Sequence, residues 1–210
     1  MSLVKLIAQS DERGLAASGL GCLDRCLPLR AERAGVLKPL WVGIVRGPDG
    51  WPARLATARS ALETPDGSEA PGSAVAAALV RTMLESAPSD WAAGPLRTWA
   101  DTCSLVALEI HQEFDTQGAG GAGRAVPDDS AELLARCREQ EIETAGAADG
   151  IPGADGPGPL VTGELRRQTR ILEILAETPG SPGLRRVMDL SAEGQRVLRA
   201  VVSRRARAGT

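Results

Sequence analysis

Hydrophobic residues recur at spacings of three and four over much of the chain, which is the period of an amphipathic α-helix. The clearest stretch runs from about Gly94 to Asp115. Its apolar positions are Leu96, Trp99, Cys103, Val106, Ile110 and Phe114, and Leu105 and Leu108 widen the stripe to most of the circumference. A helix that is apolar nearly all round is buried, so this stretch is predicted to be the central core helix.

The same period predicts further helices. One lies between a cap at Ser10–Glu12 and Pro28, although Gly14, Gly19 and Gly21 weaken it. Others are expected at about 52–63, 74–86 and 131–144, and three more at about 163–177, 183–190 and 191–205. A Pro/Gly turn at 179–182 and a junction at Leu190-Ser191 would separate the last three.

Residues 40–46 are the only strand-like stretch, because they are rich in β-branched residues and lead into the turn signal Gly47-Pro48-Asp49-Gly50. The predicted fold is therefore mainly α. It is an irregular multi-helix bundle with at most one short β-hairpin near residues 40–56, followed by a C-terminal three-helix subdomain.

Charge and composition suggest two parts joined by a linker. Residues 146–159 are Gly- and Pro-rich without periodicity, and so long a structureless stretch inside one compact domain is unusual. Residues 1–159 carry a net charge of −8 and residues 160–210 a net charge of +5. We therefore predict an acidic helical bundle domain at 1–145, a linker at 146–159 and a basic helical subdomain at 160–210.

The overall composition excludes several classes of protein. With 43% hydrophobic and 24% charged residues, wholesale disorder is not expected. The longest apolar run, Ala74–Val80, is far shorter than the roughly 20 residues of a membrane helix. Four Cys in 210 residues do not make a disulfide framework. A cytoplasmic location is expected, with no membrane partner.

The C-terminal helices resemble a helix-turn-helix unit in outline, which would place a basic helix in a nucleic-acid groove. Arg196, Arg199 and Arg204 are the candidate phosphate contacts and Gln195 the candidate base contact. However, the junction at 189–191 has no Gly, and 22 of the 24 basic residues of the whole chain are Arg, a bias typical of GC-rich coding. A structural or protein-docking helical unit explains the pattern as well.

The single histidine, His111, is the main candidate for catalysis or metal binding. On a helix His111 shares a face with Asp115, while Glu109 and Glu113 share another. A His oriented by an Asp is typical of general-base catalysis, and a carboxylate-rich helix can supply metal ligands. The competing interpretation is an ordinary helical His paired with its neighbour.

The cysteines and tryptophans are predicted to be core residues. Cys22, Cys26 and Cys103, with Cys137, could form a thiolate zinc site only if three helices converge. Free Cys is among the most buried residue types, and each of the four has apolar neighbours. No cofactor is predicted, because the Gly118–Gly123 match to G-x-G-x-x-G lacks the preceding strand that a dinucleotide site needs.

Three functional hypotheses follow. The preferred one is an intracellular interaction or regulatory protein, not an enzyme, that binds a protein partner or itself. The first alternative is a nucleic-acid-binding regulator that uses the Arg-rich helices of residues 160–210. The second is a small helical enzyme or metal protein centred on the His111 helix.

Overall fold

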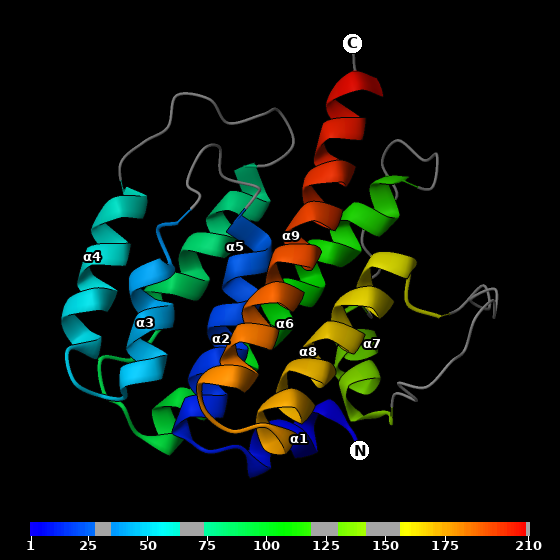
Figure 1. Cartoon of the computed structure of the whole chain (residues 1–210). Coiled ribbons are helices and arrows are strands. Elements are labelled where there is room, and N and C mark those ends of the chain that lie inside the picture. Colours follow the sequence, from blue (N-terminus) through cyan, green and yellow to red (C-terminus); the bar gives the residue numbers. More distant parts are fainter. Residues whose placement is uncertain (28–34, 64–73, 119–129, 142–155, 209–210) are drawn as a thin grey trace.

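The computed structural model of the chain describes residues 1–27, 35–63, 74–118, 130–141 and 156–208 (Figure 1). Within these ranges all regular structure is helical, and one isolated β-bridge joins Ser2 and Glu141. The helices are α1 (Leu3–Gln9), α2 (Glu12–Cys26), α3 (Lys38–Arg46), α4 (Trp51–Glu63), α5 (Ala74–Glu85), α6 (Ala93–Gly118), α7 (Ser130–Glu139), α8 (Pro159–Glu177) and α9 (Ser181–Ala208). The prediction of a mainly α multi-helix bundle is therefore confirmed.

Helices α2 and α6 are the centre of this bundle (Figure 1). The α2 helix contacts α6, α8 and α9, and α6 also contacts α8. Helices α8 and α9 form an antiparallel hairpin whose short turn contains Gly180 at a φ of 85°. Helices α3, α4 and α5 form a second group on the opposite side, while α1 and α7 pack against α6.

The α2 helix begins where the sequence predicts. Asp11 is its N-cap, and the Oδ1 atom of Asp11 accepts a hydrogen bond of 2.7 Å from the backbone of Gly14. The glycines that weaken α2 in isolation permit close packing in the fold. A Cβ on Gly19 would come within 2.9 Å of the Trp99 ring, so this glycine lets α2 approach α6.

The predicted central helix is confirmed as α6. Its residues Leu96, Trp99, Cys103, Ile110 and Phe114 are all buried. The Trp99 ring lies 6.2 Å from that of Trp51, which itself stacks edge-on against Trp91 at 5.1 Å. The indole nitrogens of Trp51 and Trp99 donate hydrogen bonds to backbone carbonyls, so these rings serve the core as predicted.

The strand predicted over residues 40–46 is wrong, because this stretch is helix α3. Leu40, Trp41 and Ile44 are buried, whereas Val42 and Val45 are exposed. This is helical spacing, and no strand occurs in the described residues of 40–56. A β-branched residue costs a helix at most about 0.7 kcal/mol, which is less than the roughly 1.5–3 kcal/mol from burying one large apolar side chain.

The junction predicted at Leu190-Ser191 is also wrong, because α9 continues without a break from Ser181 to Ala208. The C-terminal region therefore contains two helices, α8 and α9, instead of three. Leu184, Val187, Ser191 and Leu198 are buried on one continuous face. These residues are three, four and seven positions apart, so they stay on the same face of one continuous helix through residue 191.

Helices on both sides of the predicted linker share one hydrophobic core. Residues 146–155 of that linker lie outside the described residues. Beyond it, α8 and α9 contact α2 and α6, and Ile171 and Leu198 belong to the same cluster as Leu20 and Leu108. The division into folding units at 1–145 and 160–210 stays a prediction. In the folded chain the described helices of both segments pack into the same core.

Candidate functional site

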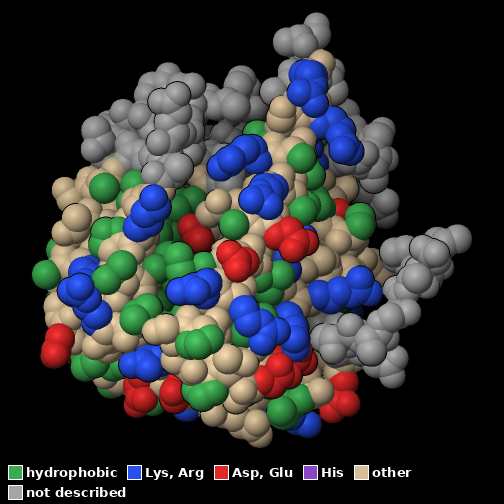
Figure 2. Space-filling view, in the orientation of Figure 1, with side chains coloured by type: hydrophobic (Ala, Val, Ile, Leu, Met, Phe, Trp, Pro, Cys, Tyr) green, Lys and Arg blue, Asp and Glu red, His purple; other side chains and the backbone are tan. Residues whose placement is uncertain are grey.

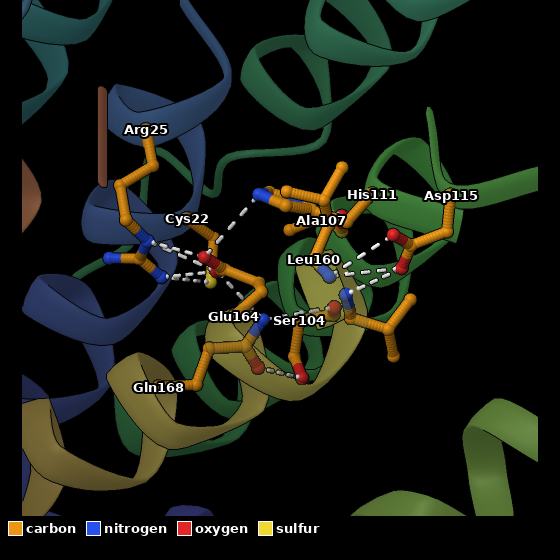
Figure 3. A network of polar contacts seen from close by, with 10 residues as sticks. Cys22, Arg25, Ser104, Ala107, His111, Asp115, Leu160, Glu164 and Gln168 are labelled. Atoms are coloured by element: carbon orange, nitrogen blue, oxygen red, sulfur yellow. Dashed lines mark hydrogen bonds and ion pairs between the residues drawn. The ribbon is translucent and has the colours of Figure 1, made fainter. Parts of the chain in front are cut away.

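A seam of polar side chains runs along the antiparallel contact between α6 and α8 (Figure 3). At one end Asp115 of α6 meets the first turn of α8. In the middle His111 faces Glu164, and further along Ser104 meets Gln168. Each pair lies about one or two helical turns from the next. The seam therefore fixes the register of α6 against α8, because a slip by one turn would leave these polar groups without partners.

Arg25 of α2 completes the seam with a fully buried ion pair. Its Nη2 atom lies 2.6 Å from Oε1 of Glu164, and its Nε atom donates to Oε2 at 2.9 Å. Burial alone would lower the pKa of Arg25 and raise that of Glu164. Their mutual attraction outweighs burial, so the pKa of Arg25 is raised and that of Glu164 is lowered. Both side chains remain charged at neutral pH.

Gln168 ties this ion pair to α6. Its Nε2 atom donates to Oε1 of Glu164 at 3.0 Å and to the backbone carbonyl of Ser104 at 3.3 Å. Its Oε1 atom accepts from the hydroxyl of Ser104 at 2.5 Å. The amide orientation follows from this pattern of donors and acceptors. Three helices are thus linked through one carboxylate.

His111 is buried in the seam and is not paired with Asp115. Its Nδ1 atom lies 2.6 Å from the carbonyl oxygen of Ala107, which assigns the proton to Nδ1 in the neutral ring. Its Nε2 atom then faces Oε2 of Glu164 at 3.8 Å, beyond hydrogen-bond distance. Burial lowers the pKa of His111, and the nearby charge of Glu164 opposes that shift only in part.

The four residues of the predicted His111 site point to different places. Asp115 shares the helix face of His111 as expected, but its carboxylate binds the start of α8. Glu109 is exposed, whereas the ring of His111 is buried. Glu113 is half-buried. The arrangement therefore does not bring a carboxylate of α6 to the imidazole; the acid that faces His111 is Glu164 of α8.

Asp115 caps α8 from a distance of 45 residues in the sequence. Both of its carboxylate oxygens lie 3.1 Å from the backbone nitrogen of Leu160, and Oδ2 lies 3.0 Å from that of Val161. The N-terminal turn of a helix has unpaired N–H groups and a partial positive charge. A carboxylate placed there accepts hydrogen bonds from these N–H groups and interacts favourably with the charge. Gly158, the N-cap residue of α8, has no side chain that could do so.

Asp115→Ala is expected to lower the free energy of unfolding by about 1 kcal/mol, the usual cost of losing a side-chain cap. Asn is nearly as good a cap as Asp, so Asp115→Asn serves as the matched control and is expected to lose less. Urea denaturation followed by circular dichroism measures both. Equal stability of Asp115→Ala and the unchanged protein would contradict the capping role.

The four cysteines, which are candidates for a thiolate site only as an alternative, are buried as predicted. Cys22, Cys26 and Cys103 are fully buried, and none of the four Cys forms a disulfide. Burial raises the pKa of Cys22 to about 12, and that of Cys26 and Cys103 well above the ordinary value. Thiols of this kind are poor nucleophiles and poor ligands. Among the described residues, no three His, Cys, Asp or Glu side chains are placed to hold a metal ion.

The candidate nucleic-acid residues on α9 differ in exposure. Arg196, Arg199 and Arg204 are exposed, and Figure 2 shows Lys and Arg side chains over the C-terminal part of α9. Gln195 instead donates from Nε2 to the backbone oxygen and to Oδ1 of Asp24, at 2.9 and 2.8 Å. The three arginines therefore form an exposed group, while Gln195 joins α9 to α2.

Sequence reasoning missed Arg25, Glu164, Gln168 and Ser104. A signal for two of them exists, because Glu164 and Gln168 continue the helical spacing of the buried Val161 and Leu172. Polar residues at positions where an apolar stripe is expected indicate a buried polar contact. Arg25 likewise lies between Cys22 and Cys26, but no local pattern indicates that its partner is 139 residues away.

The fold belongs to the mainly α class, as a multi-helix bundle. Comparison with protein-family models, curated proteins and solved structures finds no match to this chain. None of the helices in the described ranges combines the length and the apolar character of a membrane span.

Proposed function

We propose that the protein is an intracellular interaction or regulatory protein, not an enzyme, that binds an acidic protein partner through α9 in the cytoplasm. The observation that carries this proposal is the exposed group Arg196, Arg199 and Arg204, called the α9 Arg face below. From Gly194 to Ala208 the helix contains five Arg and no acidic residue. An exposed arginine group of one sign is a surface that attracts carboxylates.

The inaccessibility of the chemically versatile residues supports a non-enzymatic role. His111, Glu164, Cys22 and Cys103 are each no more than 2% exposed. A substrate could not reach them without a rearrangement of the surrounding helices. The polar seam accordingly has a structural role in this proposal, and the binding role belongs to the surface.

The C-terminal end of α9 is held in place, which favours a preorganised surface. The guanidinium of Arg205 lies 4.4 Å from the ring centroid of Phe114 and donates a hydrogen bond to the carbonyl of Phe114. This contact joins the end of α9 to α6. Exposed arginines on an anchored helix lose less conformational entropy on binding than arginines on an unanchored one.

Nucleic-acid binding through the same face is the second candidate, and the exposure of the three arginines favours it. Guanidinium groups bind phosphates as readily as carboxylates. Because Gln195 is engaged by Asp24, this candidate predicts contacts to the phosphate backbone without base reading. Such binding weakens steeply with salt and shows little dependence on nucleotide sequence.

The test compares two polyanions of different class on the full-length chain. Fluorescent poly-glutamate and mixed-sequence duplex DNA are titrated from 50 to 300 mM salt with the unchanged protein and with Arg196→Gln/Arg199→Gln/Arg204→Gln. Poly-glutamate is expected to bind more tightly, and the triple variant is expected to lose about tenfold or more in affinity, since each charge contact contributes up to roughly 1 kcal/mol.

The matched control changes three exposed arginines on other helices, Arg46, Arg81 and Arg136, to Gln. This control variant removes the same charge, so its affinity for the polyanions is expected to fall by less than about twofold if the α9 Arg face is the binding surface. Tighter binding of DNA would favour the second candidate. Equal losses in the two triple variants, or no binding of either polyanion, would overturn the use of this face.

A further inference from the structure

We propose that His111 makes the junction of α2, α8 and α9 sensitive to acid, so that uptake of one proton by its imidazole accompanies local opening of this junction around Arg25. The proposal concerns the buried seam and does not depend on what α9 binds. It rests on three features of the seam: the way the imidazole is held, the charges around it, and the way α9 covers Arg25.

The imidazole has one nitrogen fixed and one available for a proton. Nδ1 is engaged with the carbonyl oxygen of Ala107 at 2.6 Å. Nε2 is directed at Oε2 of Glu164 but lies 3.8 Å from it (Figure 3). In the neutral ring two electron-rich atoms therefore face each other. A proton would have to bind at Nε2, between the ring and the carboxylate.

Burial disfavours a second buried cation at His111 while the junction is closed; Arg25 and Arg167 add to this effect, and Glu164 opposes it. The charged groups that act on the imidazole are Glu164 and Arg167 of α8 and Arg25 of α2. The carboxylate of Glu164 already accepts three hydrogen bonds from Arg25, two from Nε and one from Nη2. Protonated His111 would share this one carboxylate with Arg25 and leave a net positive charge without access to water, which is costly. Burial is the largest cause of the lowered pKa of His111, and the charge of Glu164 offsets it only in part.

Helix α9 packs directly against Arg25 of α2. A Cβ on Gly194 would overlap Cδ of Arg25 and lie 2.9 Å from its Cγ, so α9 rests directly on the arginine stem. The Nη1 atom of Arg25 and the hydroxyl of Ser191 on α9 are both buried and have no hydrogen-bond partner within the described part of the chain. Movement of α9 away from α2 would let water hydrogen-bond to both groups and solvate the added positive charge. Opening is therefore expected at this contact.

The size of the effect follows from proton linkage. We take His111 of the closed form, whose pKa is lowered by burial, as neutral over the pH range tested, whereas in an open, hydrated form its pKa is that of an ordinary histidine, about 6.5. Because only the open form binds the proton, acid favours opening. For these values the opening equilibrium rises about tenfold between pH 7.5 and pH 5.5, and most of the rise occurs below pH 6.5.

The buried cysteines report the opening. Cys22 is fully buried and its Sγ atom accepts a hydrogen bond of 3.4 Å from Nη2 of Arg25, so opening around Arg25 is expected to expose this thiol, whereas Cys137 lies on α7. A disulfide reagent that reacts in acid, such as 4,4′-dithiodipyridine, labels each thiol of the full chain from pH 7.5 to 5.5. Mass spectrometry gives the labelling rate of each cysteine relative to the same peptide unfolded. For Cys22 this relative rate is expected to rise about tenfold, while that of Cys137 stays within twofold.

His111→Gln is the decisive variant, because Gln cannot take up the proton. Its Cys22 labelling is expected to change by less than twofold over the same range. If the labelling rate of Cys22 rises equally in His111→Gln, His111 does not cause the response and the proposal is overturned. If the labelling rates of Cys22 and Cys137 rise equally in the unchanged protein, the chain unfolds globally, which also overturns the proposal.

A measurement on the unchanged protein keeps the proposal testable if His111→Gln fails to fold. His111 is the only histidine, so its ring signals in an NMR spectrum need no assignment. In the closed form these signals are expected to stay at the neutral position well below pH 6.5. A normal titration near pH 6.5 with Cys22 still protected would contradict the coupling of the proton to opening.

Discussion

Glu164→Gln is expected to lower the free energy of unfolding by about 3–5 kcal/mol, one of the two largest effects that the structure predicts for a single substitution. The variant leaves Arg25 charged and 1% exposed, without the carboxylate that it contacts at 2.6 and 2.9 Å. Gln168 loses its charged acceptor as well. The cost comes from a buried charge that has no partner, and is therefore larger than the net contribution of the pair.

The matched control is Glu173→Gln on the same helix. Glu173 pairs with Arg170 at 3.1 Å, but both side chains are partly exposed, so the expected loss is below about 1 kcal/mol. Urea denaturation at pH 7 measures the two variants side by side. If Glu164→Gln loses no more stability than Glu173→Gln, the ion pair is not buried as described.

Gly194→Ala is expected to destabilise the protein by about 1–3 kcal/mol, the range found for overpacked cores. Replacing Gly by Ala inside a helix normally stabilises it by up to about 1 kcal/mol, so the structure predicts a reversal of sign. The cause is the Cγ and Cδ atoms of Arg25 beneath Gly194, with Cδ of Arg167 at 3.2 Å. Arg25 cannot move aside without losing its contacts with Glu164.

Gly163→Ala on α8 supplies the comparison. A Cβ there would meet only the guanidinium end of Arg167, at 3.3 Å from Nη1, and a flexible side-chain end can shift at little cost. Unchanged or slightly higher stability is therefore expected for Gly163→Ala. A stabilising Gly194→Ala, measured in the same thermal or urea experiment, would show that α9 does not rest on Arg25.

Much of the fold could be predicted because periodicity is a local property of the sequence. The α6 helix combines a long 3–4 spacing with buried large side chains, and α2 has a clear N-cap at Asp11. The two errors arose where a local preference and tertiary packing disagree. In α3 the burial of Leu40, Trp41 and Ile44 outweighs β propensity. In α9 a continuous buried face passes through the predicted junction at Ser191.

The candidate site could be predicted less well, because its contacts join distant parts of the sequence. His111 and Asp115 were found from their spacing within one helix, but their partners lie on α8, at Glu164, Leu160 and Val161. Helical spacing reports which residues share a face and does not report what lies opposite that face. The Arg25–Glu164 pair, 139 residues apart, depends wholly on how three helices meet.

A double-mutant cycle at Arg25 and Glu164 tests most directly the central claim, that one buried ion pair joins α8 and its neighbour α9 to α2 in a single core. The free energies of unfolding of Arg25→Met, Glu164→Met and the double variant are measured in urea. The structure predicts one cooperative transition and a coupling energy of about 2 kcal/mol or more, with the double variant more stable than either single one. A coupling below about 0.5 kcal/mol, or a separate transition of the α8–α9 region, would contradict it.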